Sequence, residues 1–373
     1  MTVFGTRPEA IKMAPVIKVL QSETTRFEVK VVVTGQHREM LDQVLDFFEI
    51  RPDHDLDIMR HGQTLTEITS RVLAGLEEVI LAEKPAIVLV HGDTTTTFAA
   101  SLAAFYQRVA VGHVEAGLRS HNMYNPFPEE MNRRLTGALT TLHFAPTDSA
   151  AAQLAQEGVP QSNVFVTGNT VIDALLGTVK DNYVFGDQVL RGLDFEKERV
   201  ILLTTHRREN WGIPMQRIFS AVRQLITTFP DIRVVFPVHK NPQIREVAVG
   251  ALGGLPRVNL IEPPAYEEFV NLMARVCFLL TDSGGLQEEA PSLGKPVLVL
   301  RETTERPEGV AAGTALLVGT DDGQIVKEAT KLLTDTKAYA AMAEAPNPYG
   351  DGQAAKRIAQ ILWEQRELLR PED

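Results

Sequence analysis

Three acidic residues stand where apolar, strand-like runs give way to turn residues. Asp93 follows the run 86–90, Glu115 comes directly after the run 109–114, and Glu129 opens a helix-like segment behind two prolines. A carboxyl group at a strand end can transfer a proton if its site removes it from water. Each one alone is more often a helix cap or a surface acid. The residues by themselves leave both interpretations open.

Two cations lie near the start of the chain, in the segment Phe4-Gly5-Thr6-Arg7-Pro8-Glu9-Ala10-Ile11-Lys12. Thr6 can cap a helix there, and Glu9 three positions later can complete a capping box. Cations at a helix N-terminus oppose the helix dipole unless an anion is bound. Arg7 and Lys12 therefore indicate an anion site, and the alternative is a pair of solvated cations.

A second loop, Thr281-Asp282-Ser283-Gly284-Gly285, follows an apolar run and leads into a helix-like segment. The Ser283 hydroxyl and the bare backbone amides of Gly284 and Gly285 can cradle a phosphate. Glu289, further along the same helix, can accept hydrogen bonds from a ribose diol. The loop is neither a P-loop nor a G-x-G-x-x-G segment, so the alternative is an ordinary helix entry.

Other polar residues carry weaker signals. His206 follows the run 200–204 and can donate to a phosphate or transfer a proton, or it can simply cap a helix. The segment 53–57 resembles a metal cluster in composition but lacks partners at metal-ligand spacing, so we expect a solvated loop. The chain has no H-E-x-x-H, G-x-S-x-G or C-x-x-C segment. We therefore expect no metal and no redox cofactor.

The elements that position these residues are short β-branched runs, each followed by a segment of helical period. This is the alternation of βαβ units in a parallel sheet. One series predicts strands at 2–4, 29–33, 86–90, 109–114, 142–145 and 163–166, and a second predicts them at 200–204, 233–238, 258–261, 278–281, 296–300 and 315–318.

The chain is long enough for two hydrophobic cores, because 373 residues exceed what one core usually organises. We predict an α/β fold with two Rossmann-like, doubly wound domains that face a cleft. The expected boundaries are 1–170 and 171–351, and a C-terminal helix at 352–369 is expected to pack back on the first domain.

Composition narrows the class of protein. A formal net charge of -11 argues against nucleic-acid binding, which needs a basic face. No apolar run reaches the length of a membrane span, and the start of the chain lacks the pattern of a secretory signal. The single cysteine, Cys277, lies in an apolar run and is expected to be a core thiol. A cytoplasmic enzyme is the expectation.

Seven segments, in this order, closely resemble the non-hydrolysing UDP-N-acetylglucosamine 2-epimerases. They span nearly the whole chain: residues 4–12, His91-Gly92-Asp93-Thr94, residues 114–119, Pro128-Glu129-Glu130, residues 206–210, residues 282–285 and Thr304-Glu305-Arg306-Pro307-Glu308. The resemblance implies the glycosyltransferase-B architecture and a homodimer. It also implies interconversion of UDP-N-acetylglucosamine and UDP-N-acetylmannosamine without a cofactor, through elimination of UDP to 2-acetamidoglucal and re-addition.

The resemblance also implies roles for individual residues. Proton transfer at C2 falls to Asp93, Glu115 and Glu129, with Arg133 beside them. Uracil and ribose contacts fall to Phe269 and Glu289. Stabilisation of the leaving diphosphate falls to a third group of residues: Arg7, Lys12, His206, Ser283, Gly284, Gly285 and Arg306. Which carboxylate performs which step stays open.

The chain departs from the family at a possible regulatory site. Family members activated by a second substrate molecule carry a Gln-His-Arg-Gln segment and an arginine before Gln-Thr-Leu. Gln36, Arg207 and His239 match that site, but Glu39 and Gly62 replace the glutamine and the arginine. A carboxylate and a missing side chain weaken anion binding there. Pro264 also stands where the family often has a glutamine near the base.

Three other functions stay open at this stage. A glycosyltransferase that uses a UDP-sugar would explain residues 283–289, but not the three carboxylates together with residues 6–9. A hydrolysing 2-epimerase would release UDP and free N-acetylmannosamine. A nucleotide-sugar sensor would bind without turnover. No nucleic-acid or membrane partner is expected for any of them.

Overall fold

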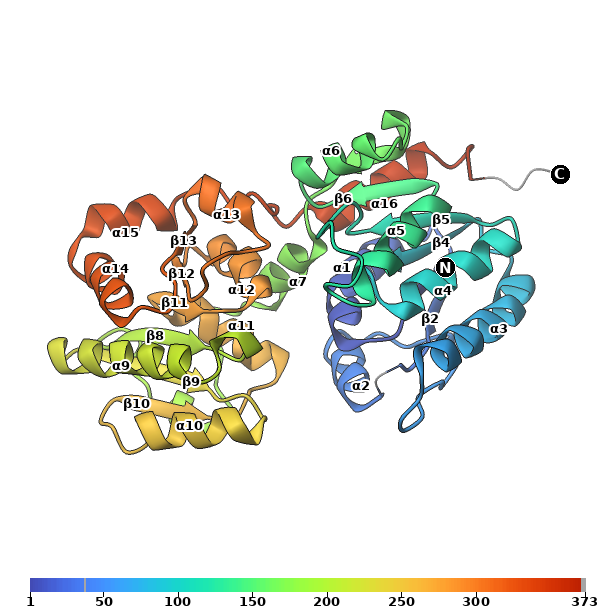
Figure 1. Cartoon of the computed structure of the whole chain (residues 1–373). Helices are drawn as coiled ribbons and strands as arrows, with labels where there is room; N and C mark the ends of the chain where they lie inside the picture. The colour runs from blue at the N-terminus through green and yellow to red at the C-terminus, as the bar shows by residue number, and fades with distance from the viewer. Residues whose placement is uncertain (37, 370–373) are drawn as a thin grey trace. The chain divides into compact units, whose positions relative to one another are not determined.

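The computed structural model describes residues 1–36 and 38–369 of the chain (Figure 1). The chain divides into two compact units. Unit 1 comprises Met1–Ala174 and Tyr349–Asp373, of which 349–369 are described, and unit 2 is Leu175–Pro348. Among the described residues, no helix combines the length and the apolar character needed to cross a membrane.

Unit 1 holds a seven-stranded parallel sheet. Its strands are β1 (Thr2–Phe4), β2 (Val31–Val33), β3 (His54–Asp55), β4 (Ile87–His91), β5 (Ala110–Val114), β6 (Leu142–Ala145) and β7 (Val164–Val166). Its helices are α1 (Arg7–Ser22), α2 (Arg38–Phe47), α3 (Leu65–Glu83), α4 (Thr95–Tyr106), α5 (Glu129–Leu139), α6 (Asp148–Gln156), the short η1 (Gln161–Asn163) and α16 (Ala354–Glu364). Helix α7 (Thr170–Thr178) begins in this unit and ends in unit 2.

Unit 2 holds a six-stranded parallel sheet. Its strands are β8 (Arg199–Thr204), β9 (Ile232–Pro237), β10 (Val258–Ile261), β11 (Phe278–Thr281), β12 (Val297–Val299) and β13 (Ala315–Leu317). Its helices are α8 (Gln188–Arg191), η2 (Arg208–Asn210), α9 (Ile213–Thr228), α10 (Pro242–Leu252), α11 (Tyr266–Arg275), α12 (Gly284–Glu289), η3 (Ala290–Leu293), α13 (Pro307–Ala312), α14 (Asp322–Thr334) and α15 (Thr336–Ala343).

Both sheets follow the doubly wound order. The strands run β3-β2-β1-β4-β5-β6-β7 in unit 1 and β10-β9-β8-β11-β12-β13 in unit 2. The order therefore reverses between β1 and β4 in the first sheet and between β8 and β11 in the second. Ligands of open α/β sheets bind beyond the carboxyl ends of the strands at such a reversal. The predicted α/β class with two Rossmann-like halves is confirmed.

All twelve predicted strands lie within two residues of the observed ends, and one observed strand was not predicted. His54–Asp55, expected to be part of a solvated loop, forms the edge strand β3, which pairs with β2. Asp53 accepts a hydrogen bond from the Val31 N–H at 2.7 Å, and His54 Nε2 lies 2.7 Å from Glu83 Oε1. These contacts hold β3 in place. Its two residues are polar, so the sequence shows no apolar periodicity that would predict a strand there.

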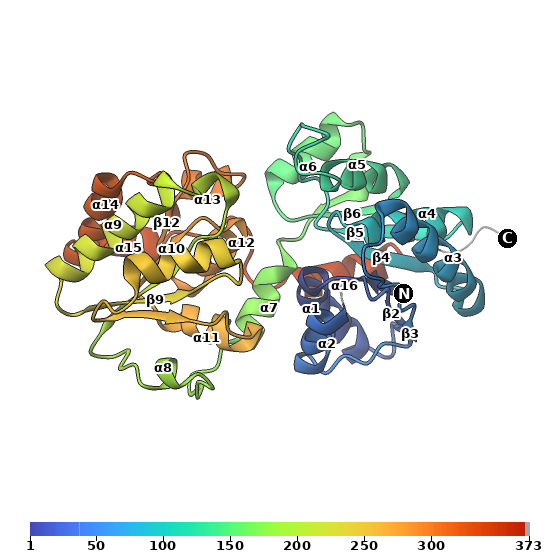
Figure 2. The ribbon, with the colours of Figure 1, turned by 60° about the horizontal axis from the view of Figure 1, so that its bottom comes forward.

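Helices cover both faces of the sheet in unit 1. Val3, Val90 and Val111 pack beneath α3 and α4 in one apolar cluster. On the other side α1 runs beside α16, so the C-terminal helix lies against the first helix of the chain (Figure 2). The predicted helix at 352–369 is observed as Ala354–Glu364, and its apolar residues Ile358 and Leu362 are buried.

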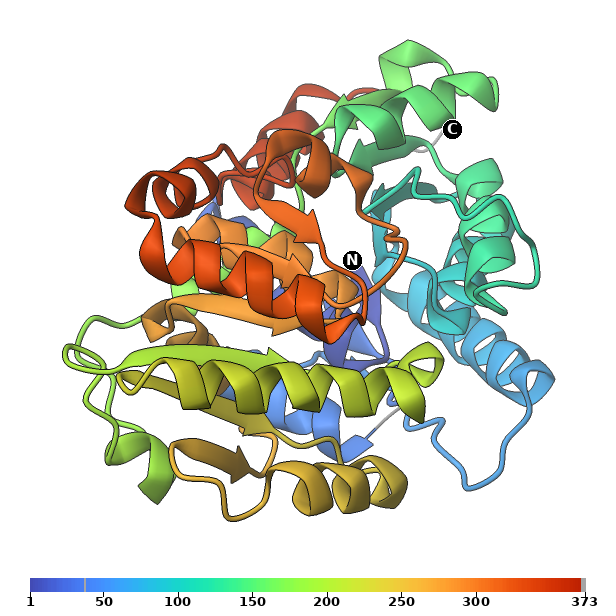
Figure 3. The same ribbon diagram turned by 60° about the vertical axis from the view of Figure 1, so that its left-hand side comes forward.

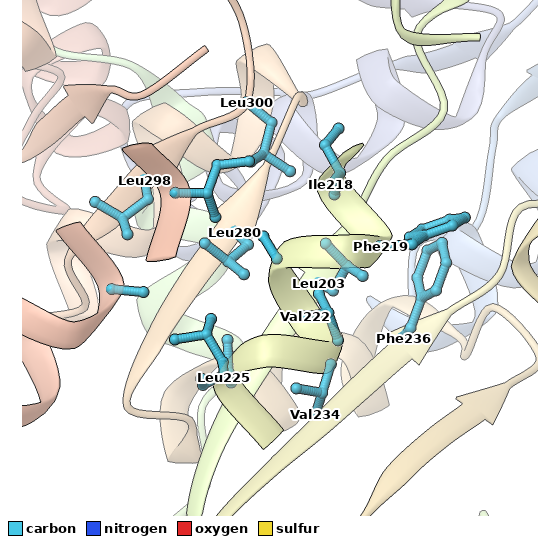
Figure 4. Packing of buried hydrophobic residues seen from close by; sticks show 14 of the residues in the cluster. Leu203, Ile218, Phe219, Val222, Leu225, Val234, Phe236, Leu280, Leu298 and Leu300 are labelled. Atoms are coloured by element: carbon cyan, nitrogen blue, oxygen red, sulfur yellow. The ribbon is translucent and has the colours of Figure 1, made fainter. Parts of the chain in front are cut away.

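The core of unit 2 is divided by its sheet. On one face α9 lies between α10 and α14 and covers the strands (Figure 3). Leu203, Val222, Phe219 and Leu280 interdigitate in this layer, all at most 1% exposed (Figure 4). The opposite face is covered by α11 and η3 around residues such as Val270. The loops after the strands are thus carried on a closely packed base.

Candidate functional site

In unit 1 the sheet order brings three loops to one edge. β1 and β4 are neighbours, and β4 pairs with β5 so that His91 lies opposite Val114. The residues that follow these strands therefore leave the sheet side by side. Asp93 and Glu115, predicted separately as strand-end acids, come to the same place for this reason.

Glu115 is the centre of this cluster. Its backbone has a φ of 62°, a left-handed conformation that costs a non-glycine residue on the order of 1–3 kcal/mol. The side chain is 7% exposed and forms an ion pair with Lys12. Asn169 Nδ2 donates to its Oε2 at 3.1 Å, His91 Nε2 lies 3.6 Å from the same oxygen, and Arg133 Nη2 lies 3.5 Å from Oε1.

These contacts determine the charge of Glu115. Burial raises the pKa of its carboxyl, but the charges of Lys12, His91 and Arg133 outweigh burial and hold the pKa well below its usual range. The carboxyl is therefore ionised throughout the neutral range. It can accept a proton, and it must receive one before it can donate.

Arg133, from α5, joins the two acidic loops. Its Nη2 donates to Asp93 Oδ2 at 2.5 Å, and its Nη1 donates to the carbonyl oxygen of Glu115. The neighbouring Asn132 donates to the Asp93 carbonyl oxygen at 3.0 Å. Glu129 begins the same helix one turn earlier and is half-buried, so it lies on the face that carries Arg133.

Glu9 was assigned only a capping role from the sequence, and the structure gives it a second one. Its Oε2 accepts from the N–H groups of Gly5 and Thr6 at 3.1 and 2.8 Å and from the Thr6 hydroxyl at 2.7 Å. Its Oε1 accepts from the hydroxyls of Thr94 and Thr97 at 2.7 and 3.1 Å. This buried carboxylate therefore fixes the loop after β1 to the loop after β4.

The two cations of the opening segment have different surroundings. The Lys12 side chain is only 18% exposed and lies against Glu115, so part of its charge is already balanced. Arg7 is half-exposed at the start of α1 and makes no ion pair with any other described residue. Arg7 is therefore the cation of this segment that remains available to an external anion.

In unit 2 the corresponding edge is organised by Asp282. β8 and β11 are neighbours with Thr204 opposite Thr281, so the loops that follow them leave the sheet together. Asp282 is fully buried, and its Oδ2 accepts from the N–H groups of His206 and Arg207 at 2.9 Å each. The Thr205 hydroxyl and Asn210 Nδ2 add bonds of 2.9 and 3.0 Å to the same oxygen.

His206 is presented on this loop. Its side chain is 40% exposed, and its Nδ1 lies 3.3 Å from Asp282 Oδ1. Its ring stacks on that of His239, with centroids 5.6 Å apart and planes within 9°. Burial lowers the pKa of His206 below its ordinary value of 6.5, although the charge of Asp282 acts in the opposite direction.

The predicted phosphate cradle begins α12. Ser283 is its N-cap residue, and Gly284 and Gly285 are its first two residues. A Cβ at Gly284 would lie 3.6 Å from Arg207 Nη2, and one at Gly285 would lie 3.4 Å from Glu289 Oε1. Because Gly284 and Gly285 carry no side chains, nothing of their own covers their backbone N–H groups between Arg207 and Glu289.

The remaining predicted ligand residues of unit 2 lie on neighbouring elements. Arg306, before α13, pairs with the buried Glu288, and its N–H donates to Thr304 Oγ1 at 3.0 Å. Phe269, on α11, is half-buried against the cluster of Val270. Arg306 was predicted to contact a diphosphate. In this structure its guanidinium donates a hydrogen bond to the carboxylate of Glu288.

The residues of the possible regulatory site are divided between the units. Gln36, in unit 1, accepts a hydrogen bond from the Thr96 hydroxyl at 3.0 Å. Arg207 and His239 are in unit 2, where Arg207 Nη1 lies 4.0 Å from Glu305 Oε1. His37 of the Gln-His-Arg-Glu segment lies outside the described residues.

Comparison with known proteins gives a consistent result. The family model described as UDP-N-acetylglucosamine 2-epimerase matches residues 20–363. The UDP-N-acetylglucosamine 2-epimerase of Bacillus subtilis (strain 168) is 57% identical over 97% of this chain and 94% of that protein. The enzyme of that name from Escherichia coli (strain K12) is 56% identical over 98% of both chains. The chain belongs to the UDP-N-acetylglucosamine 2-epimerase family.

Solved structures of family members agree with this placement. A putative UDP-N-acetylglucosamine 2-epimerase from Listeria monocytogenes superposes with a TM-score of 0.93 at 54% identity, over 100% of this chain and 98% of that one. The UDP-GlcNAc 2-epimerase from Neisseria meningitidis, solved bound to UDP-GlcNAc, gives 0.86 at 51% identity over 97% and 99%. The resemblance found in the sequence motifs and the glycosyltransferase-B type of architecture are thereby confirmed.

Sequence reasoning named the principal charged residues but missed several that hold them. His91, Asn169 and His113 were not singled out, although His91 is buried beside Glu115. His113 Nε2 contacts the Gly92 carbonyl oxygen at 2.7 Å, and burial lowers the pKa of His113 well below its ordinary value. For His91 and His113 the available signal was a histidine in an otherwise apolar, buried strand, whereas Asn169 lies outside the strands and gave no such signal. The described residues contain no group of His, Cys, Asp and Glu arranged to hold a metal ion.

Proposed function

We propose that the protein interconverts UDP-N-acetylglucosamine and UDP-N-acetylmannosamine without net hydrolysis. The observation that carries the proposal is the Glu115 cluster of unit 1, where an ionised carboxylate, a second carboxylate at Asp93 and the guanidinium of Arg133 lie at a sheet reversal. Two carboxylates held in fixed positions by a guanidinium are suited to proton transfer to and from a carbon atom. Family membership supports the substrate class.

The reaction follows from the weak acidity of the sugar C2–H. Direct removal of that proton leaves no stabilised anion, so we propose elimination of UDP. A base takes the C2 proton, the C1–O bond breaks, and UDP leaves with the bond electrons, which gives 2-acetamidoglucal. Addition of a proton to the other face of C2 and return of the UDP oxygen to C1 completes the epimerisation.

The residues fall into two groups by task. Asp93, Glu115 and Glu129 provide the carboxyl groups for the two proton transfers, and Arg133 contacts the carboxylates of Asp93 and Glu115. Binding of the nucleotide and stabilisation of the departing diphosphate are assigned to Arg7, Lys12, His206, Ser283, Gly284, Gly285, Glu289, Arg306 and Phe269. Charge and aimed N–H donors stabilise a departing phosphate in this way.

The proposal is tested by incubating the protein with UDP-N-acetylglucosamine alone in deuterated water. We expect the manno epimer to appear with one deuterium at C2. Substrate labelled with ¹⁸O in the C1–O–P bridge should also scramble its label into the non-bridging β-phosphate oxygens, because UDP leaves and returns. Lack of both deuterium and epimer would exclude the epimerase.

The same experiment separates the alternatives. Accumulation of UDP and free N-acetylmannosamine would indicate a hydrolysing 2-epimerase. Tight binding of UDP-N-acetylglucosamine without exchange would indicate a sensor. A requirement for an added acceptor would indicate a glycosyltransferase. Epimer with scrambled label and no free sugar supports elimination and re-addition.

We also propose that the enzyme is a cytoplasmic homodimer. Leu81, Phe105 and Tyr106, on the contacting helices α3 and α4, are 55, 56 and 61% exposed, which is typical of an interaction surface. Phe105→Glu should halve the mass measured by light scattering. Ile213→Glu, at a residue 67% exposed in unit 2, is the control and should leave the mass unchanged.

A further inference from the structure

The two oxygens of Asp282 have different partners. Oδ2 accepts hydrogen bonds from four donors: Thr205 Oγ1, the N–H groups of His206 and Arg207, and Asn210 Nδ2. Oδ1 is equally buried but receives no hydrogen bond from any described residue. A buried acceptor left without a donor is unusual and requires an explanation. The imidazole Nδ1 of His206, 3.3 Å from Oδ1, provides one.

The surroundings of His206 determine which ring nitrogen carries the proton. The groups that face it are the carboxylate of Asp282, the guanidinium of Arg207 on its own loop, and the ring of His239, which follows β9. Burial, Arg207 and His239 lower the pKa of His206, so the ring is neutral near pH 7 and carries one N–H. Of the two neutral tautomers of this ring, the one with its N–H at Nδ1 can donate to Oδ1, and its lone pair then lies on Nε2.

We propose that Asp282 is a positioning residue that holds the N–H of His206 at Nδ1 and so leaves Nε2 to exchange a proton with the ligand. The role of that proton rests on the proposed function, in which the ligand is the diphosphate of a UDP-sugar. When Nε2 takes up a proton from water, the imidazolium can give that proton to a departing phosphate oxygen, and until then the negative charge of Asp282 stabilises the imidazolium. Carboxylate–imidazole pairs act in this way in hydrolases.

Asp282→Asn is the informative change because the four donors dictate its orientation. The asparagine oxygen must replace Oδ2, where backbone N–H groups point, so the amide NH₂ takes the place of Oδ1. A donor then faces His206 Nδ1. The ring is forced into the opposite tautomer, with its lone pair on Nδ1 and its proton on Nε2.

The first measurement is the ¹⁵N spectrum of the full-length enzyme with labelled histidine, with the His206 signals assigned by their loss in His206→Gln. In the parent we expect the N–H at Nδ1, and in Asp282→Asn we expect it at Nε2. The pKa of His206 should also fall further in the variant, because the charge that raises it is gone. An N–H at Nε2 in the parent would overturn the proposal.

The second measurement is a double-mutant cycle on epimerisation. Asp282→Asn alone should lower kcat by up to about ten-thousandfold, the scale seen when a carboxylate that orients a histidine is neutralised, with KM changed far less. In a His206→Gln background the same change should cost less than about threefold. An equal loss in both backgrounds would show that Asp282 acts through the fold and not through His206.

Thr205→Val is the matched control. It removes one of the four bonds to Oδ2 and leaves Oδ1 and the ring contact in place. It should lower stability while the His206 tautomer stays at Nδ1 and kcat changes less than about tenfold. A lack of epimerisation by the parent would refute the proposed function, whereas the tautomer measurement needs no turnover and tests Asp282 separately.

Discussion

In each unit, loops leave the sheet next to the point at which the strand order reverses. These loops occupy equivalent positions in the two sheets, but different interactions hold them. In unit 1, Glu115 is held by the charged side chains of Lys12 on α1 and Arg133 on α5, and by the amide of Asn169, which precedes α7. The opposite charges of these side chains balance one another. In unit 2, backbone N–H groups converge on Asp282, and His206 and the glycine amides are left open. The first arrangement fixes charges in place, whereas the second keeps donors available for a ligand.

The largest effect that this comparison predicts is that of Glu115→Gln. The change leaves Lys12 and Arg133 near a neutral amide, and loss of one partner from a buried pair costs about 3–5 kcal/mol. Removal of an acid–base group should also lower activity at least about a hundredfold. Deuterium incorporation at C2 and urea unfolding measure the two effects.

Glu130→Gln is the control for Glu115→Gln. Glu130 is equally buried and accepts from Ser120 N–H and from Arg134, but it lies outside the cluster of Glu115. Glu130→Gln should lower the free energy of unfolding, while its epimerase activity stays within about tenfold of that of the parent. Equal losses of activity in the two variants would remove the distinction between the cluster and the rest of the unit.

Acid should destabilise unit 1 through His143. Burial, assisted by the charge of Arg119, lowers the pKa of His143 from 6.5 to about 4. Because the folded-state pKa is the lower one, the unfolded chain takes up the proton first. The stabilisation is complete above pH 6.5 and is lost as the pH falls towards about 4, by about 3 kcal/mol in total at 1.36 kcal/mol per pKa unit.

His143→Gln tests this pH dependence. The free energy of unfolding of the variant should fall less steeply than that of the parent between pH 6.5 and 4.5. Chemical unfolding followed by fluorescence at several pH values provides the measurement. Parallel curves for parent and variant would contradict the role of His143.

Arg133→Lys should have an intermediate effect. The planar guanidinium contacts both Asp93 and the Glu115 carbonyl oxygen, and a lysine ammonium cannot reproduce that fork. We expect kcat to fall roughly tenfold to a hundredfold with a small change in KM. Arg134→Lys, at a residue whose side chain is 40% exposed on the same helix, should leave the kinetics unchanged. Similar kinetics in both variants would show that the fork is unimportant.

The smallest predicted effect belongs to unit 2. Gly285→Ala places a methyl group 3.4 Å from Glu289 Oε1 and beside the open amides, so binding of UDP should weaken about tenfold. Alanine also favours the helix by up to about 1 kcal/mol, so stability should not fall. Gly250→Ala, with no atom within 4 Å of the new Cβ, is the control in calorimetric titration with UDP. Unchanged affinity in Gly285→Ala would show that the loop does not bind the nucleotide.

The sequence predicts the elements well and the contacts among charged residues poorly. Buried parallel strands are short β-branched runs, so their positions are visible locally, whereas β3 is polar and has only two residues. Strand ends then locate Asp93 and Glu115. The partner of Lys12 lies 103 residues away, and the second loop held by Glu9 lies 85 residues away. Such pairs depend on sheet order, which local periodicity does not encode.

The position of α16 has a consequence for how the protein is made. Unit 2 is one continuous stretch, Leu175–Pro348, whereas unit 1 needs α16 against α1. On the ribosome, α1 emerges first and its partner helix emerges after the whole of unit 2. The second unit can therefore complete its fold while the first still exposes an apolar helix face, which reverses the usual order in which the N-terminal domain finishes first.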